Sequence, residues 1–327
     1  MNPRSRKLVC AGCLALAVLL LRWPVVAQSA SDESTLTDSA IQSLQLTPEA
    51  AEHLQRAVSD HDYLTAEKLL LAEIDHDPHS PRAGRLLAYA GVVYFRNQDY
   101  LNAAVAWKKS EAIAPLDPSL RFSLAMTYVH MAHPDWARPV LESLAAQNDK
   151  EALYPYWLGR LDYDGHQYNH AIQHFQHAIE LNPQMARAYD NLGLCYYYQN
   201  QNELAVSNYE KAIALDQASP HPSPWPYLNL AITQQFLNRL PDAEKNLREA
   251  IRLDPKFAQA HFQLGTVLED QQRLDDALKE LSEAAHLDPA YAEPHMAMAR
   301  ILHKVGQEPR AREEVRTYLH LHPHSTP

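Results

Sequence analysis

Residues 186–219 read ARAYDNLGLCYYYQNQNELAVSNYEKAIALDQAS, and residues 258–291 read AQAHFQLGTVLEDQQRLDDALKELSEAAHLDPAY. The two stretches have equal length, and both carry Leu-Gly at positions 7 and 8 and alanine at positions 20 and 27. Apolar residues recur three or four positions apart in two runs, which a short polar segment separates. This spacing predicts two amphipathic helices that pack together as a hairpin.

The same pattern extends through most of the 327 residues. Alanine occupies position 20 of each unit, and the distance along the sequence from one of these alanines to the next is regular except at two places, where it is slightly longer. Six units also have proline at position 32, where it ends the second helix. These alanines are Ala66, Ala103, Ala137, Ala171, Ala205, Ala243, Ala277 and Ala311. We therefore predict an all-α fold of eight helical hairpins, at residues 47–80, 84–117, 118–151, 152–185, 186–219, 224–257, 258–291 and 292–325.

One such hairpin cannot bury its own apolar stripe, so consecutive hairpins are expected to stack into a right-handed α-solenoid superhelix. Position 8 is glycine or alanine in seven units, and this small residue lets the paired helices approach closely. In residues 152–185, Gly165 lies at the turn and is expected to take the positive φ. An insertion at residues 220–223 creates a proline-rich segment at 220–226, which we expect to form a stiff loop.

Residues 1–27 have the pattern of a secretory signal peptide. Arg4, Arg6 and Lys7 precede an apolar run over residues 8–21, which is shorter than the roughly 20 residues of a membrane-spanning helix. We predict cleavage after Ala27, with an uncleaved anchor as the alternative, and no stable membrane span in the exported chain. A flexible linker is expected at residues 28–46 and a short tail at residues 326–327. We expect the exported protein to be periplasmic or secreted, most simply as part of a bacterial envelope.

Charge and cysteine content narrow the classes of partner. Residues 1–27 contain four basic residues and no acidic one, so their removal makes the net charge of −11 more negative by four. Nucleic acid is therefore not expected as a partner, because binding to its phosphates requires clustered basic residues. Cys195 is the single cysteine after residue 27, which leaves no intramolecular disulfide, and its neighbours place it on the packed side of a helix. Stability is therefore expected to come from packing.

No motif of a known catalytic chemistry is present. The sequence has no His-Glu-x-x-His, no paired CxxC, no GxSxG and no phosphate-binding loop, so we predict neither an enzyme nor a cofactor. The histidines at 166–177 are the one group that suggests a metal, because the spacing of His170, His174 and His177 on one helix permits chelation of Zn²⁺. No cysteine accompanies them and their positions should face outward, so a solvated face is favoured, and a metal-binding protein or enzyme that uses these histidines is kept as an alternative.

The repeat resembles that of the tetratricopeptide repeat family, which has Leu-Gly at positions 7 and 8, Tyr at 11, Ala at 20, an aromatic residue at 24, Ala at 27 and Pro at 32. The resemblance covers residues 47–325 and is strongest at Leu192-Gly193, Tyr196, Ala205, Tyr209 and Ala212. In that family the stripe at positions 2, 5, 9 and 12 of each first helix lines a concave groove that binds peptides. With the adjoining position 13 counted, the resemblance implies a groove lined by Arg85, Phe95, Arg96, Phe122, Tyr156, Arg160, Tyr163, Arg187, Tyr197, Tyr198, Trp225, Phe236 and Phe262.

The chain is therefore interpreted as an exported, non-catalytic scaffold that binds a protein or peptide segment. Exposed aromatic residues mark contact sites, although some of these rings could instead pack between adjacent hairpins. The expected ligand is an extended segment with apolar side chains and an acidic group near Arg160 and Arg187. The alternative is an accessory subunit of an envelope machine for secretion, pilus or polysaccharide assembly. The apolar residues of the last helix, Val315, Tyr318, Leu319 and Leu321, predict self-association or coverage by a partner.

Overall fold

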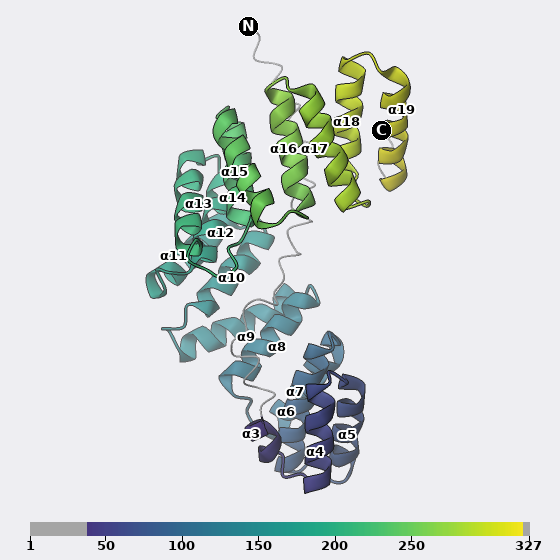
Figure 1. Ribbon diagram of the computed structural model, residues 1–327. Helices are drawn as coiled ribbons and strands as arrows, with labels where there is room; N and C mark the ends of the chain where they lie inside the picture. Colours follow the sequence, from purple (N-terminus) through teal and green to yellow (C-terminus); the bar gives the residue numbers. More distant parts are fainter. Residues whose placement is uncertain (1–37, 323–327) are drawn as a thin grey trace. The chain divides into compact units, whose positions relative to one another are not determined.

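The computed structural model describes residues 38–322, which form 17 helices and no strand (Figure 1). The helices are α3 Asp38–Ser43, α4 Pro48–Ser59, α5 Tyr63–Asp75, α6 Pro81–Arg96, α7 Tyr100–Ile113, α8 Pro118–His130, α9 Pro134–Gln147, α10 Leu153–Asp164, α11 Tyr168–Leu181, α12 Ala186–Tyr198, α13 Asn202–Asp216, α14 Trp225–Phe236, α15 Leu240–Leu253, α16 Ala258–Asp270, α17 Leu274–Leu287, α18 Glu293–Lys304 and α19 Glu308–Leu321. The predicted all-α repeat fold is confirmed.

The chain divides into two compact units, Met1–Val140 and Leu141–Pro327. The boundary falls within α9, a helix that contains Pro139 and therefore lacks one backbone donor. No helix within residues 38–322 combines the length and the apolar character that crossing a membrane requires. The predicted signal peptide at residues 1–27 and the tail at 326–327 lie outside the described residues.

Every hairpin turn has the same backbone geometry. The residue at repeat position 15 has a positive φ of 58° to 63° in seven turns and 78° in the eighth, where it is glycine. These residues are His61, Gln98, Ala132, His166, Asn200, Asn238, Gln272 and Gly306. The prediction that Gly165 takes this conformation is wrong by one position: Gly165 has a φ of −81° and ends α10, and His166 follows in the left-handed region. The backbone N–H of His166 donates to Tyr163 O (2.9 Å), and that of Gln167 donates to Asp162 O (2.8 Å), which is a Schellman ending.

The small residue at position 8 brings the paired helices together, as predicted. A Cβ atom built on Gly193 of α12 would lie 2.6 Å from Cε1 of Tyr209 on α13, and one built on Gly91 of α6 would lie 2.4 Å from Nε1 of Trp107 on α7. Tyr209 and Trp107 are both fully buried, so each glycine leaves room for the large side chain at position 24. The helix pairs therefore interlock through a glycine and a ring.

In the unit that ends at Val140, residues 38–46 depart from the flexible linker that the sequence predicts. They include α3, and Ile41 and Leu44 are buried in the core cluster to which residues of α4 and α6 also belong. Arg85 fixes this segment from α6, because its Nε donates to Ser43 O (3.1 Å) and its Nη2 to Gln45 Oε1 (2.9 Å). Burial of two apolar side chains and these hydrogen bonds together hold the segment against the first hairpins.

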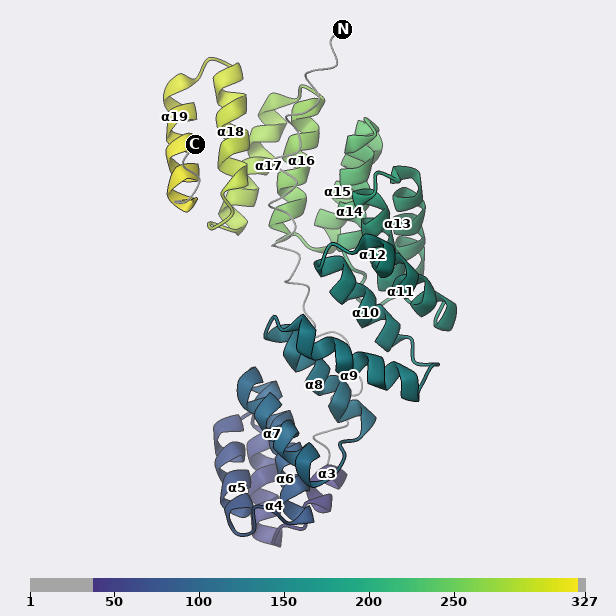
Figure 2. The ribbon, with the colours of Figure 1, turned by 180° about the vertical axis from the view of Figure 1, so that it is seen from behind.

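In the unit that begins at Leu141, five hairpins follow one another from α10 to α19 (Figures 1 and 2). The proline-rich segment at 220–226 is shorter as a loop than predicted, because Trp225 and Pro226 form the first turn of α14. The backbone N–H of Ser223 donates to Asp216 Oδ2 at the end of α13 (2.5 Å), which ties the loop to the preceding helix.

Candidate binding face

The first helices of consecutive hairpins lie against one another in the unit of residues 141–327. α10 contacts α12, α12 contacts α14, α14 contacts α16 and α16 contacts α18 (Figure 2). Side chains of these helices that do not pack inside the hairpins therefore share one surface. We use the name α10–α14 face for the half-buried or exposed side chains of Arg160, Arg187, Tyr197, Tyr198 and Phe236 together with the buried side chains of Tyr156, Asp190, Asn191 and Asn229 beneath them.

A hydrogen-bonded polar chain crosses this face. Arg160 on α10 donates from Nη1 to Asn191 Oδ1 on α12 (2.7 Å), and the Asn191 side chain donates to Arg187 O one turn earlier (2.8 Å). Asn229 on α14 donates to Asp190 Oδ1 (2.9 Å). Asp190, Asn191 and Asn229 are buried, so these contacts fix the spacing of three first helices in the interior of the unit.

Two members of the polar chain keep unused hydrogen-bonding atoms. Arg187 is half-buried, with its guanidinium 4.7 Å from the ring centroid of Tyr156, and its Nε and Nη1 have no hydrogen-bond partner among residues 38–322. Asp190 Oδ2 likewise lacks a partner within the described chain. Burial raises the pKa of Asp190 to about 7, against the smaller opposing effects of the Asn229 hydrogen bond and the Arg160 charge. Arg187 Nε and Nη1 and Asp190 Oδ2 are thus buried polar atoms without a partner in the described chain, and burial keeps the Asp190 carboxyl group protonated below about pH 7.

Aromatic side chains border the polar chain where α12 and α14 end. Phe236 is 61% exposed, and its ring centroid is 6.4 Å from that of Tyr197 in an edge-on arrangement. Tyr198 is half-buried and stacks on Tyr168 of α11, with the ring centroids 5.1 Å apart. An accessible aromatic edge of this kind is suited to binding a peptide, because the rings offer apolar area to its side chains.

Other predicted groove residues in the same unit serve packing instead. Tyr156 and Tyr163 are buried, each with 7% of its surface exposed, so they do not present accessible rings. Trp225 lies edge-on to Phe257, with the centroids 4.7 Å apart, and Phe262 lies edge-on to Tyr291 at 5.2 Å. The expectation that this stripe consists of exposed aromatic residues is therefore wrong for Tyr156 and Tyr163, because neighbouring hairpins cover them.

The predicted groove residues in the unit that ends at Val140 form no equivalent surface. Arg85 is engaged with the segment around α3, and Phe95 packs among Tyr100, Trp107 and His130. Arg96 is half-buried on α6, and Phe122 is half-buried on α8. Of the predicted residues, Tyr197 and Phe236 are the pair that the structure brings together around an accessible ring, whereas Arg160 is hydrogen-bonded to Asn191 and the unsatisfied nitrogen atoms of Arg96 and Arg187 are buried.

Asn191 and Asn229 are the site residues that sequence reasoning missed. Both occupy repeat position 6, immediately before the Leu-Gly or Leu-Ala pair of the first helix. When the repeats are aligned, both units have an amide side chain at position 6, next to the apolar position 7. This shared amide is the signal that would have identified them, because a buried amide needs hydrogen-bond partners from an adjacent hairpin.

The histidines at 166–177 do not converge. His174 Nδ1 lies 2.7 Å from Asp162 Oδ2, His170 contacts Gln167 and His166 contacts Tyr168. Within residues 38–322, no group of three or more histidine, cysteine, aspartate or glutamate side chains could hold a metal ion. Cys195 is fully buried, and burial raises the pKa of its thiol to about 12, which is typical of a structural cysteine.

Four sequence models of the tetratricopeptide repeat match the chain, at residues 159–200, 184–256, 228–292 and 268–327. Together they cover residues 159–327 without a gap. No curated protein matches the chain significantly.

Solved structures share the fold. A tetratricopeptide repeat protein from Parabacteroides merdae is 15% identical, with a TM-score of 0.63 over 81% of this chain and 99% of that chain. PilW, a widely conserved type IV pilus biogenesis factor, is 20% identical with a TM-score of 0.59, over 64% of this chain and 94% of its own. PilF of Pseudomonas aeruginosa is 17% identical with a TM-score of 0.57, over 64% of this chain and 93% of its own.

Proposed function

Because the chain belongs to the tetratricopeptide repeat family, we propose that it is an exported, non-catalytic scaffold that binds a protein segment on the α10–α14 face. The observation that carries the proposal is the edge-on pair of Tyr197 and Phe236, in which the Phe236 ring is 61% exposed at the end of α14. An extended segment with one apolar anchor would cover this exposed ring.

The polar chain supports binding more than catalysis. Asn191 and Asn229 are engaged in hydrogen bonds that hold the first helices, and the Cys195 thiol is buried with a raised pKa, which disfavours the thiolate that nucleophilic chemistry requires. Mutually bonded side chains hold the helices that carry the exposed aromatic edge in place, and such preorganisation lowers the entropy that is lost on binding.

Export is the second part of the proposal, and it rests on residues 1–27. The basic residues followed by the short apolar run support a signal peptide cleaved after Ala27. Cell fractionation and N-terminal sequencing test it: we expect the protein in the envelope or medium with Gln28 as its first residue. Recovery of the full-length chain in the cytoplasm would contradict export.

An accessory role in an envelope assembly machine is the second candidate. It is favoured by the predicted signal peptide together with the shared fold of PilW, which is described as a pilus biogenesis factor. This candidate differs from the first in requiring one fixed partner protein, which crosslinking in the native cell followed by mass spectrometry would recover as a single dominant product.

Selection from a displayed random peptide library tests the binding face. Affinities of the selected peptides are then measured by fluorescence anisotropy for wild type, for Phe236→Ala and for Trp136→Ala, a matched control whose ring is 52% exposed on α9. Loss of a central aromatic contact should weaken binding about tenfold in the Phe236 variant, and the control should bind as wild type does. Equal affinities for all three proteins would remove the α10–α14 face from consideration.

A further inference from the structure

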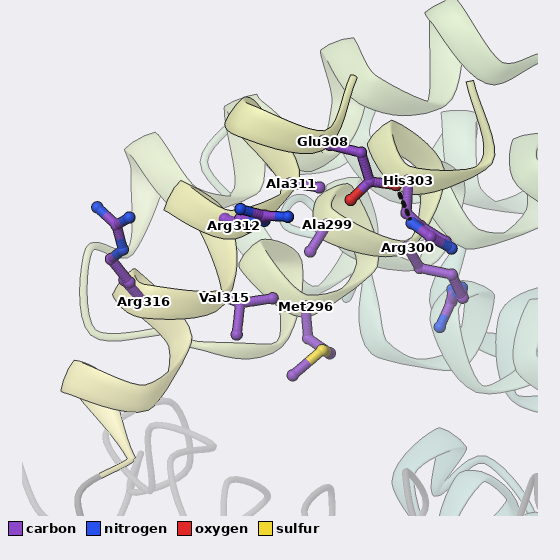
Figure 3. Close-up of a pocket in the computed structure, with 9 residues that line it drawn as sticks. All are labelled: Met296, Ala299, Arg300, His303, Glu308, Ala311, Arg312, Val315 and Arg316. Carbon is purple, nitrogen blue, oxygen red and sulfur yellow. Dashed lines mark hydrogen bonds and ion pairs between the residues drawn. The ribbon is translucent and has the colours of Figure 1, made fainter. Parts of the chain in front are cut away.

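A cavity of about 520 Å³ opens on the last hairpin, between α18 and α19 (Figure 3). Its floor is apolar and consists of Met296 and Ala299 from α18 and of Ala311 and Val315 from α19. Figure 3 shows the side chains of Met296 and Val315 directed into the same open space. Met296 is among the large apolar side chains that are exposed in the described chain.

The residues that line the cavity on α19 can be compared with the residues at the same repeat positions of α17 in the preceding hairpin. In α17, Leu274 and Leu278 at repeat positions 17 and 21 pack against the core cluster to which Ile301 of α18 belongs, and α17 contacts α18. The same two positions of α19 hold Glu308 and Arg312, which line the cavity. The cavity thus lies beside two positions of α19 whose counterparts in α17 are packed leucines, and in α19 charged residues stand in their place.

The charges around the cavity are predominantly positive. Arg312 and Arg316 are exposed on α19, and neither has an ion-pair or hydrogen-bond partner within residues 38–322. Arg300 lies on the opposite side of the floor in Figure 3 and is paired with Glu269, with Nε 2.9 Å from Oε1. Two free guanidinium groups beside an apolar floor give this part of the acidic chain a local positive charge, which is complementary to carboxylates.

We propose that the α18–α19 cavity is a docking site for an acidic amphipathic helix of another protein. Apolar side chains of that helix fill the space above Met296, Ala299, Ala311 and Val315, and its carboxylates pair with Arg312 and Arg316. A second copy of this chain is a poorer fit, because a two-fold pairing of the same cavity would bring the free arginines of both copies together.

The test uses the full-length protein and two synthetic helical peptides. One peptide has alanine and leucine on one face and glutamate on the other, and the second is identical except that lysine replaces glutamate. Anisotropy titrations compare wild type, the double variant Arg312→Glu/Arg316→Glu and the control Arg310→Glu, an exposed arginine of α19 outside the cavity. Circular dichroism melting verifies that every variant is folded.

We expect the glutamate peptide to bind wild type and the control equally, and to lose about tenfold or more in affinity for the double variant. The lysine peptide should prefer the double variant, and added salt should weaken both complexes. Equal binding of the glutamate peptide to all three proteins, or no binding to wild type, would overturn the proposal. So would a dimer of the wild type in sedimentation that the double variant abolishes, because a second copy would then occupy the cavity. Phe236→Ala should leave this binding unchanged, which separates the cavity from the α10–α14 face.

Discussion

Replacement of Asp190 by asparagine should change how stability depends on pH. Asp190 is completely buried on α12, and its burial raises the pKa from 3.8 to about 7. Between these two values the folded protein retains a proton that the unfolded chain releases, so the free energy of unfolding falls as pH rises from about 4 to about 7. This difference in pKa corresponds to about 4 kcal/mol of stability lost across that range.

Asparagine resembles the protonated carboxyl group and cannot ionise. Its side-chain oxygen can still accept the Asn229 hydrogen bond, which measures 2.9 Å in the structure. The Asp190→Asn variant should therefore be more stable than wild type by about 1.5 kcal/mol at about pH 5 and by up to about 4 kcal/mol at about pH 8.

Urea unfolding followed by circular dichroism at these two pH values measures the difference for both proteins. The same substitution at Asp242, an exposed residue of α15, is the matched control and should follow wild type at both pH values. A gain in stability that is equal under both conditions would show that Asp190 is ionised in the folded protein throughout, and that the reasoning from burial is incorrect.

Three further predictions concern packing and the thiol. Gly193→Ala should lower the free energy of unfolding measured in urea, because overpacking against Tyr209 costs about 1–3 kcal/mol. The higher helix propensity of alanine returns only about 1 kcal/mol. Unchanged stability would mean that the two helices can move apart at no cost. Trp107→Ala should cost about 3–5 kcal/mol by the same assay, whereas the exposed Trp136→Ala should cost little. Cys195 should resist iodoacetamide at mildly alkaline pH in the folded protein and react after unfolding, as mapped by mass spectrometry; labelling of the folded protein would contradict its burial.

The order of the helices could be predicted from the sequence because the features that determine it are local and repeated. An alanine at position 20 and a glycine or alanine at position 8 describe one hairpin, and the contacts of Gly193 with Tyr209 and of Gly91 with Trp107 occur within single hairpins. Periodicity along a helix reports this kind of contact directly.

The exposure of the candidate site could not be predicted in the same way. Tyr156 and Phe236 were assigned to the same groove, yet the first is 7% exposed and the second 61%. The pattern of one helix reports which side is apolar, but not how much of the other side the next hairpin covers. The bonds from Arg160 to Asn191 and from Asn229 to Asp190 link different repeats, so they depend on the stacking geometry and not on any single repeat.

The segment around α3 was missed for a related reason. It lies outside the repeat, so its apolar residues Ile41 and Leu44 had no register that would place them in a core. The consequence for the site is that Arg85, which the stripe assigned to ligand binding, is engaged with the protein's own backbone.

The recurring left-handed residue in the hairpin turns has a practical consequence for engineering. Seven of the eight turns place a residue other than glycine in a conformation that costs L-amino acids about 1 kcal/mol or more, with asparagine the least affected. Replacing Ala132 or Gln98 by glycine would relieve that strain, partly offset by the greater freedom of glycine in the unfolded chain. The turns at Gln98 and Ala132 are therefore two sites where stability can be adjusted outside both the α10–α14 face and the α18–α19 cavity.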